Sequence, residues 1–208
     1  GNAAGVTYTY NRFCIKILAA DCRVEGVRVY DASSMGIGGG DGALRAIIRD
    51  NEVTAAADMG IFVNDNLASI LPAYGLCANN TVIGWGSSTT TAVGIGIRGT
   101  DWRIEGNYVE STASYANEQL GIEVWHGGDR SIVVNNVVRA LTYAEYGISL
   151  AAPHTSAVGN LVVGSTSYGI EAATTGPVQI TGNTVIDPTG TGIALNISAT
   201  TDADHTAI

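Results

Sequence analysis

The sequence of 208 residues predicts an all-β fold: a single-stranded, right-handed parallel β-helix, a solenoid of about seven coils. Three observations support this prediction. One short motif repeats along the chain, a second motif interleaves with it, and the composition suits small regular layers. Apolar residues make up 46% of the chain but include only two Phe and two Met, so Val, Ile, Leu and Ala must fill the interior.

The first motif is a small or polar residue, then usually Asn, then any residue, then Val. Its seven copies lie 24, 29, 27, 29, 24 and 23 residues apart and begin at Gly26, Asp50, Asn79, Gly106, Asn135, Gly159 and Gly182. Units of this length cannot bury an apolar face alone, so we expect them to stack in register. The Asn side chains would then form a ladder at a bend, hydrogen-bonded from coil to coil.

The second motif is Gly-Ile followed by alternating residues. It occurs at Gly36, Gly60, Gly94, Gly121, Gly147, Gly169 and Gly192. In most coils its Ile precedes the Asn of the first motif by 12 to 14 residues, which predicts a constant register of internal Ile and Val columns. We expect each Gly to supply a tight corner or a positive φ. We also expect insertions only between the Asn-x-Val strand and the next Gly-Ile.

Other repeat folds fit the sequence less well. A leucine-rich repeat needs a Leu consensus that is absent, a propeller blade needs about 40 or more residues, and helical repeats need a 3.6-residue period. We therefore expect one domain over residues 1–208, with regular coils at about 15–197. Neither end looks capped, which predicts either a fragment of a longer chain or a homotrimer.

These repeats resemble those of the pectate-lyase-like superfamily of parallel β-helices, most closely bacteriophage tailspikes and polysaccharide depolymerases. The resemblance covers roughly residues 15 to 197 and implies a polysaccharide substrate and an extracellular, virion or cell-surface location. The known catalytic motifs are missing. Trp125-His126-Gly127-Gly128 only partly matches the Gly-His-Gly of polygalacturonases, and Ala152-Pro153-His154-Thr155 lacks both acids of the epimerase Asp-Pro-His-Glu. No cluster of Asp suggests the calcium site of pectate lyases.

Residues that follow each Gly-Ile should point outward and form columns, with coils about 4.8 Å apart. One column reads Gly38, Phe62, Gly96, Glu123, Ser149, Glu171 and Ala194, and the next includes Arg98 and Trp125. Two acids on one face are typical of a glycosidase, which uses a pair of carboxyl groups. The Tyr-rich insertions beside this face indicate a sugar-binding surface, because aromatic rings pack against sugars. The catalytic candidates are Glu123, Glu171, Glu118 and His126. The substrate-binding candidates are Trp125, Arg98, Tyr115, Tyr143, Glu145, Tyr146 and Ser149.

Charge and cysteine content restrict the partners. The net charge of −9 disfavours nucleic acid, and no apolar run is long enough for membrane insertion. Three Cys without paired spacing indicate neither a disulfide scaffold nor a metal site, and no cofactor is expected. The sequence thus predicts hydrolysis or elimination of a bacterial surface polysaccharide. A non-catalytic glycan-binding module and a structural shaft or adhesin remain the alternatives.

Overall fold

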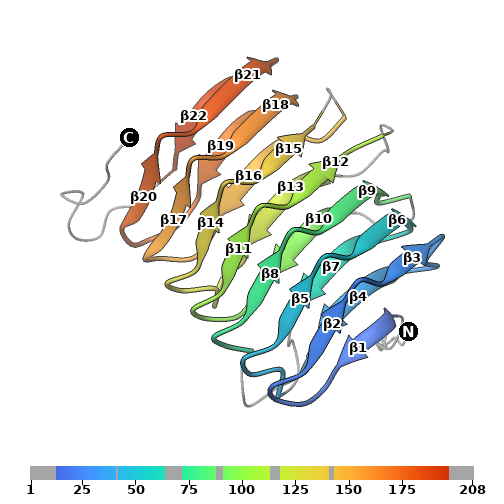
Figure 1. Ribbon diagram of the computed structural model, residues 1–208. Coiled ribbons are helices and arrows are strands. Elements are labelled where there is room, and N and C mark those ends of the chain that lie inside the picture. The colour runs from blue at the N-terminus through green and yellow to red at the C-terminus, as the bar shows by residue number, and fades with distance from the viewer. Residues whose placement is uncertain are drawn as a thin grey trace, which may run out of the picture.

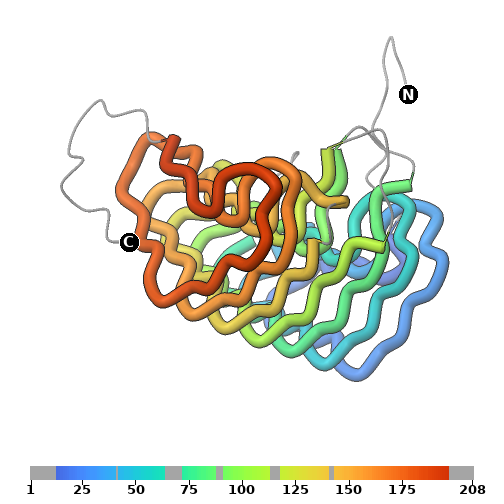
Figure 2. Tube along the Cα trace, turned by 90° about the horizontal axis from the view of Figure 1, so that it is seen from above, coloured from blue at the N-terminus to red at the C-terminus, as the bar shows by residue number. Residues whose placement is uncertain are grey.

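A computed structural model describes residues 13–40, 42–63, 72–87, 91–112, 118–140 and 143–196. The chain winds through three parallel sheets, and each coil contributes one strand to each sheet in turn. Figure 1 shows the coils stacked in chain order, and Figure 2 shows the same stack from above. The described residues form strands, turns and bends but no helix. The predicted parallel β-helix of about seven coils is confirmed.

The three sheets are named here in the order in which the chain meets them. Sheet I contains β1 (Phe13–Ile17), β4 (Met35–Gly39), β7 (Met59–Val63), β10 (Thr91–Ile97), β13 (Glu118–Val124), β16 (Tyr146–Leu150), β19 (Tyr168–Ala172) and β22 (Thr191–Leu195). Sheet II contains β2 (Arg23–Glu25), β5 (Ile47–Arg49), β8 (Leu76–Ala78), β11 (Arg103–Glu105), β14 (Ile132–Val134), β17 (Thr155–Val158) and β20 (Val178–Thr181). Sheet III contains β3 (Arg28–Tyr30), β6 (Glu52–Ala56), β9 (Thr81–Trp85), β12 (Tyr108–Glu110), β15 (Val137–Arg139), β18 (Leu161–Ser165) and β21 (Thr184–Pro188).

The core is built from aliphatic columns inside the coil. Ile37, Ile61, Ile95, Ile122, Ile148 and Ile170 pair in register along sheet I, and each is fully buried. The Val of the first motif forms the matching column on sheet III. The interior is therefore filled mainly by the aliphatic residues that the composition predicts, but Trp85 and Trp102 are also buried in it. The register fixes which residues of sheet I face outward.

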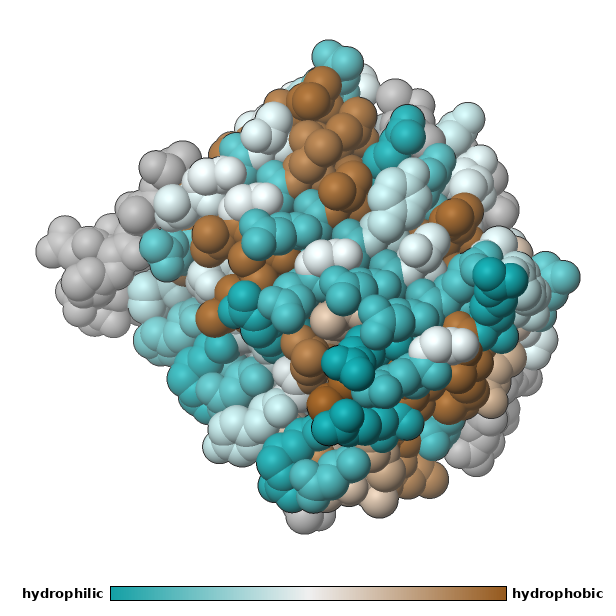
Figure 3. All heavy atoms as spheres, viewed as in Figure 1, coloured by the Kyte–Doolittle hydropathy of each residue, from teal (hydrophilic) through white to brown (hydrophobic). Residues whose placement is uncertain are grey.

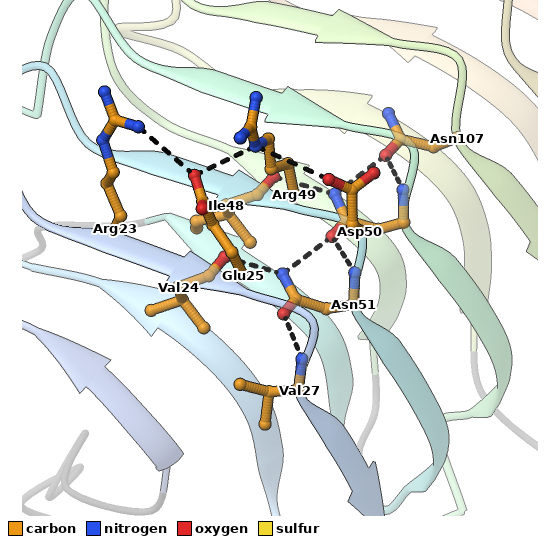
Figure 4. A network of polar contacts seen from close by, with 10 residues as sticks. Arg23, Val24, Glu25, Val27, Ile48, Arg49, Asp50, Asn51 and Asn107 are labelled. Carbon is orange, nitrogen blue, oxygen red and sulfur yellow. Dashed lines mark hydrogen bonds and ion pairs between the residues drawn. The ribbon is translucent and has the colours of Figure 1, made fainter.

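The Asn ladder occupies the corner between sheets II and III. Each Asn from Asn51 to Asn160 donates its side-chain amide to the side-chain oxygen of the next Asn, at 2.8–3.0 Å. Figure 4 shows Asn51 accepting from the backbone of Val27 and donating to the carbonyl of Val24. The predicted hydrogen bonding between coils is confirmed, and it satisfies the buried amides at this corner.

The Gly of the Gly-Ile motif has a different role from the one expected. None of these glycines has a positive φ, so the expected corner or positive φ is wrong. A Cβ on Gly121 would lie 2.4 Å from Val138 Cγ1 and 2.5 Å from the carbonyl oxygen of Gly147. Glycine is required because a Val from the far side of the same coil and a carbonyl of the next coil both pack directly against this backbone. The positive φ belongs instead to the residue before the ladder Asn, as at Asp50 (57°) and Asn135 (54°).

The insertions are also less uniform than expected. Several fall before sheet I as predicted, for example between β12 and β13. However, β7 ends at Val63 and β8 begins only at Leu76, so this coil carries its insertion after the Gly-Ile strand. The expectation of a single insertion point is therefore wrong for this coil.

The outer faces of sheets II and III change in character along the stack. Arg28 pairs with Glu52, and Arg49 with Glu25, on the N-terminal coils. In Figure 3 apolar residues gather over β18 and β21, and Ile186 on β21 is 42% exposed. The ion pairs of the N-terminal coils lie largely in water and contribute little to stability.

Candidate functional site

The outward columns of sheet I agree with the predicted register. Gly96 pairs with Glu123, Glu123 with Ser149, and Ser149 with Glu171 on β10, β13, β16 and β19. These strands are consecutive neighbours in sheet I (Figure 1). Glu123 and Glu171 are therefore two coils apart, about 10 Å by strand spacing. Ser149 lies between them and is only 5% exposed.

Glu123 is the most unusual residue of this face. Its carboxyl oxygen Oε2 is buried and has no hydrogen-bond partner among the described residues. Burial raises the pKa of this carboxyl to about 8, the nearby Trp125 indole opposes the shift, and the charges of Glu118 and Glu171 add to it. A carboxyl in such surroundings is protonated at neutral pH and can donate a proton.

Two tyrosines border the carboxylates. The rings of Tyr146 and Tyr168 lie 5.5 Å apart between centroids, with an interplanar angle of 42°. Burial, followed by the charges of Glu171, Glu118 and Glu145, raises the pKa of Tyr146. The same carboxylates thus affect both Glu123 and Tyr146, which places Glu118, Glu123 and Glu171 around one region of sheet I.

Glu118 and Glu171 each accept a hydrogen bond from a nearby side chain. Thr91 Oγ1 donates to Glu118 Oε2 at 3.3 Å, and Asn196 Nδ2 donates to Glu171 Oε1 at 2.8 Å. Asn196 directly follows β22, so the last coil completes the surroundings of Glu171. Both acids are half-buried and still open to solvent, unlike the Oε2 atom of Glu123.

Trp125 occupies the outward position expected for it, next to Arg98 in the neighbouring coil. Its ring packs edge-on against Phe62, with centroids 5.5 Å apart, and its indole nitrogen is buried without a hydrogen-bond partner in the described residues. Trp125, a substrate-binding candidate, is therefore half-buried and forms a wall beside Glu123. Phe62 belongs to an apolar group on the outer face of sheet I that also includes Met35, Met59 and Phe13.

The remaining candidates lie at the margin of this face. His126 is exposed in the turn after β13, and Tyr143 is 40% exposed in the connection before β16. Glu145 is half-buried, and its charge raises the pKa of Tyr146. Tyr115 lies outside the described residues. The candidate face therefore combines Glu118, Glu123, Glu171, Ser149 and the Tyr146–Tyr168 pair.

Three neighbours of the candidate residues were not themselves among the sequence candidates. Tyr168 and Asn196 lie in outward columns, so the register alone could have pointed to them. Phe62 lies one coil before Gly96 and contacts Trp125 across that glycine, which no local pattern reveals. Within the described part of the chain, no three His, Cys, Asp or Glu side chains group closely enough to hold a metal ion.

The family model for a right-handed β-helix region matches residues 18–205. The chain belongs to the right-handed β-helix family. No curated protein sequence matches this β-helix protein significantly. Within the described ranges there is no long apolar helix of the kind that spans a bilayer.

Solved structures share the fold of this β-helix protein at low identity. The periplasmic alginate epimerase AlgG is 14% identical, with a TM-score of 0.63 over 91% of this chain and 47% of that chain. The catalytic unit of a GH87 α-1,3-glucanase from Streptomyces thermodiastaticus is 12% identical over 88% of this chain and 49% of that chain, with a TM-score of 0.41. This chain thus spans about half the length of either structure, and the likeness to AlgG shows the fold.

Proposed function

We propose that this β-helix protein processes a polysaccharide on the outer face of sheet I, with Glu123 as the general acid. The observation that carries the proposal is the half-buried Glu123 carboxyl, whose Oε2 atom is fully buried and whose pKa is raised to about 8. At neutral pH this carboxyl holds a proton that it can give to the oxygen leaving a glycosidic bond. Two further carboxylates on the same face supply the second catalytic group such a reaction needs.

In the proposed reaction Glu171 is the base. It removes a proton from a water molecule, the water oxygen bonds to the anomeric carbon, and the glycosidic C–O bond breaks as Glu123 protonates the departing oxygen. Inverting glycosidases hold their two carboxyls about 6.5–9.5 Å apart, and two coils span about 10 Å before side-chain reach is considered. The small side chain of Ser149 leaves room between the two acids.

The Tyr146–Tyr168 pair and Glu118 would hold the substrate. Aromatic rings pack against the C–H faces of sugars, and a carboxylate accepts hydrogen bonds from sugar hydroxyls. Both tyrosines lie beside Glu171, since its charge raises the pKa of Tyr146 and Tyr146 packs on Tyr168. The proposed site therefore runs along sheet I from β13 to β22, with the sugar chain crossing several coils.

The biological setting of the proposal comes from the resemblance to tailspike depolymerases. We propose a bacterial surface polysaccharide as the substrate, a homotrimer as the assembly, and an extracellular, virion or cell-surface location. Comparison with AlgG supports polysaccharide processing only in general, because that protein is named as an alginate epimerase and shares the fold at 14% identity.

A glycan-array screen followed by product analysis tests the proposal. The parent protein and Glu123→Gln are compared, with Glu52→Gln on sheet III as the matched control. Cleavage by the parent and by Glu52→Gln but not by Glu123→Gln supports the proposal. Binding without cleavage by the parent would indicate a glycan-binding module instead. Absence of any glycan binding would indicate a structural shaft or adhesin.

A further inference from the structure

Phe62 lies on the outer face of sheet I, yet only 1% of its surface is exposed. The backbone register places it in the same outward column as Gly96 and Glu123, one coil apart at each step. It belongs to a cluster with Met35 and Met59 that is separate from the core inside the coil. A buried aromatic ring outside the main core, in the column of the candidate acid, needs a structural explanation.

Gly96 allows the ring to reach beyond its own coil. A Cβ on Gly96 would lie 2.7 Å from Phe62 Cδ2 and 2.9 Å from Phe62 Cε2. The ring therefore covers the backbone of Gly96, where any side chain would displace it. It extends to the next coil, where it meets Trp125 edge-on at 5.5 Å. Phe62 and Trp125 thus form a continuous aromatic wall on one side of Glu123.

Two unsatisfied polar atoms lie at this wall. The Trp125 indole nitrogen and Glu123 Oε2 are both buried, and within the described residues neither makes a hydrogen bond of ordinary geometry, although the indole lies close enough to the carboxyl to lower its pKa. Such atoms are usually hydrogen-bonded to water when water can reach them. The wall explains why water does not reach this side of the carboxyl.

We infer that Phe62 is a positioning residue for Glu123, because it holds the Trp125 ring in place and keeps water away from the carboxyl. In this inference Phe62 acts through the Trp125 ring that it contacts. The role of Phe62 in catalysis rests on the proposed function. Its effect on the hydration of the Glu123 carboxyl can be measured without any substrate. Phe62 and Gly96 would then act together: Phe62 provides the aromatic ring, and Gly96 leaves the space that the ring occupies.

The other charged and titratable groups around Glu123 come from its own strand and from neighbouring strands. Glu118 lies on the same strand, Arg98 follows β10, Tyr146 lies on β16, and Glu171 and Tyr168 lie on β19. A substitution at Phe62 leaves all these groups in place. A change in the titration of Glu123 would therefore report the loss of the aromatic wall.

The test is an NMR titration of the Glu123 carboxyl in the full chain, assigned with Glu123→Gln. Phe62→Ala should lower the pKa of Glu123 by at least about one unit, because water can then reach the carboxyl, and burial is a larger cause of the raised pKa than the opposing contact with Trp125. Phe62→Leu, which keeps apolar bulk, should lower it less and should fold even if Phe62→Ala does not. Phe13→Ala is the matched control: it shortens another aromatic side chain of the same apolar group and should leave the pKa unchanged.

Gly96→Ala offers an independent route to the same result, since its methyl group would displace the ring without removing it. An unchanged Glu123 pKa in folded Phe62→Leu and Gly96→Ala would overturn the inference. A lowered pKa with no cleavage of any glycan by the parent would leave the inference standing and the proposed function wrong. Where the parent does cleave a glycan, the alkaline limb of the pH–rate profile should move down with the pKa.

Discussion

The side-chain amide nitrogen of Asn107 lies 2.9 Å from the side-chain oxygen of Asn136 in the next coil. The same amide donates to the carbonyl of Cys77, and its oxygen accepts from the backbone and side chain of Asn80. Asn107 is only 1% exposed, so none of these groups can turn to water if the side chain is removed. A leucine of similar size could not replace it, because the partners would remain buried without hydrogen bonds.

We therefore expect Asn107→Ala to lower the free energy of unfolding by about 2–4 kcal/mol. Asn183→Ala should cost less, because that Asn is partly exposed and water can replace it. Urea denaturation of both variants and the parent measures the difference. Equal losses at the two positions would show that burial of the ladder does not determine its contribution.

The close approach between Gly121 and Val138 leads to a second prediction. A methyl group on Gly121 would meet Val138 Cγ1 at 2.4 Å and the carbonyl oxygen of Gly147 at 2.5 Å, and the carbonyl cannot move without breaking the sheet. Gly121→Ala should destabilise the protein by about 2–3 kcal/mol. Gly192→Ala is the matched control, because nothing lies within 4 Å of its Cβ position. That variant should be neutral or slightly stabilising, through the unfolded chain. A similar loss in both variants would contradict the packing argument.

The sequence predicted the fold and the register well because both depend on repetition. The column from Gly96 through Glu123 and Ser149 to Glu171 could be read directly, since residues at equal positions in successive coils become neighbours. The Asn ladder followed from the same logic. Such contacts depend only on the position of each residue within its repeat, and this position can be read from the sequence.

The sequence could not predict contacts between residues that occupy different positions of the repeat. The sequence suggests a tight corner or a positive φ at the Gly of the Gly-Ile motif, but the reason for this glycine is steric and involves a Val from a distant part of the coil. The sequence places Trp125 in an outward column, but it does not show that Phe62 reaches across the coil of Gly96 and covers it. The burial of Glu123 has the same origin. The burial of a side chain on the outer face depends on such individual contacts, and the repeat pattern of the sequence does not predict them.

Thiol reactivity gives a third prediction. Cys77 is fully buried, and burial raises the pKa of its thiol to about 12, while a hydrogen bond from Asn80 opposes the shift. Cys14 on β1 is exposed. Because the thiolate is the reactive form, a maleimide should label Cys14 in the folded protein and Cys77 only after unfolding. Mass spectrometry of the labelled peptides checks this, and Cys77→Ser is the control for assignment. Rapid labelling of Cys77 in the folded state would contradict its burial.

The raised pKa of Glu123 predicts how stability depends on pH. In the unfolded chain this carboxyl ionises near its ordinary pKa of 4.5, whereas in the folded protein it ionises only near 8. Between these values the folded protein binds more protons than the unfolded chain, so Glu123 makes the protein progressively less stable as pH rises through this window. Above about pH 8 the cost is complete and is on the order of a few kcal/mol.

Glu123→Gln removes this ionisation while keeping nearly the same shape. We expect the variant and the parent to have similar free energies of unfolding at pH 4, and the variant to be more stable by about 2 kcal/mol or more at pH 9. Urea denaturation at the two pH values measures the difference. Glu52→Gln is the control: Glu52 lies partly exposed on sheet III beside Arg28, so its substitution should change stability by less than about 1 kcal/mol at either pH. If Glu123→Gln gains no stability relative to the parent between pH 4 and pH 9, the Glu123 carboxyl is hydrated. It would then not stay protonated at neutral pH and could not act as the general acid.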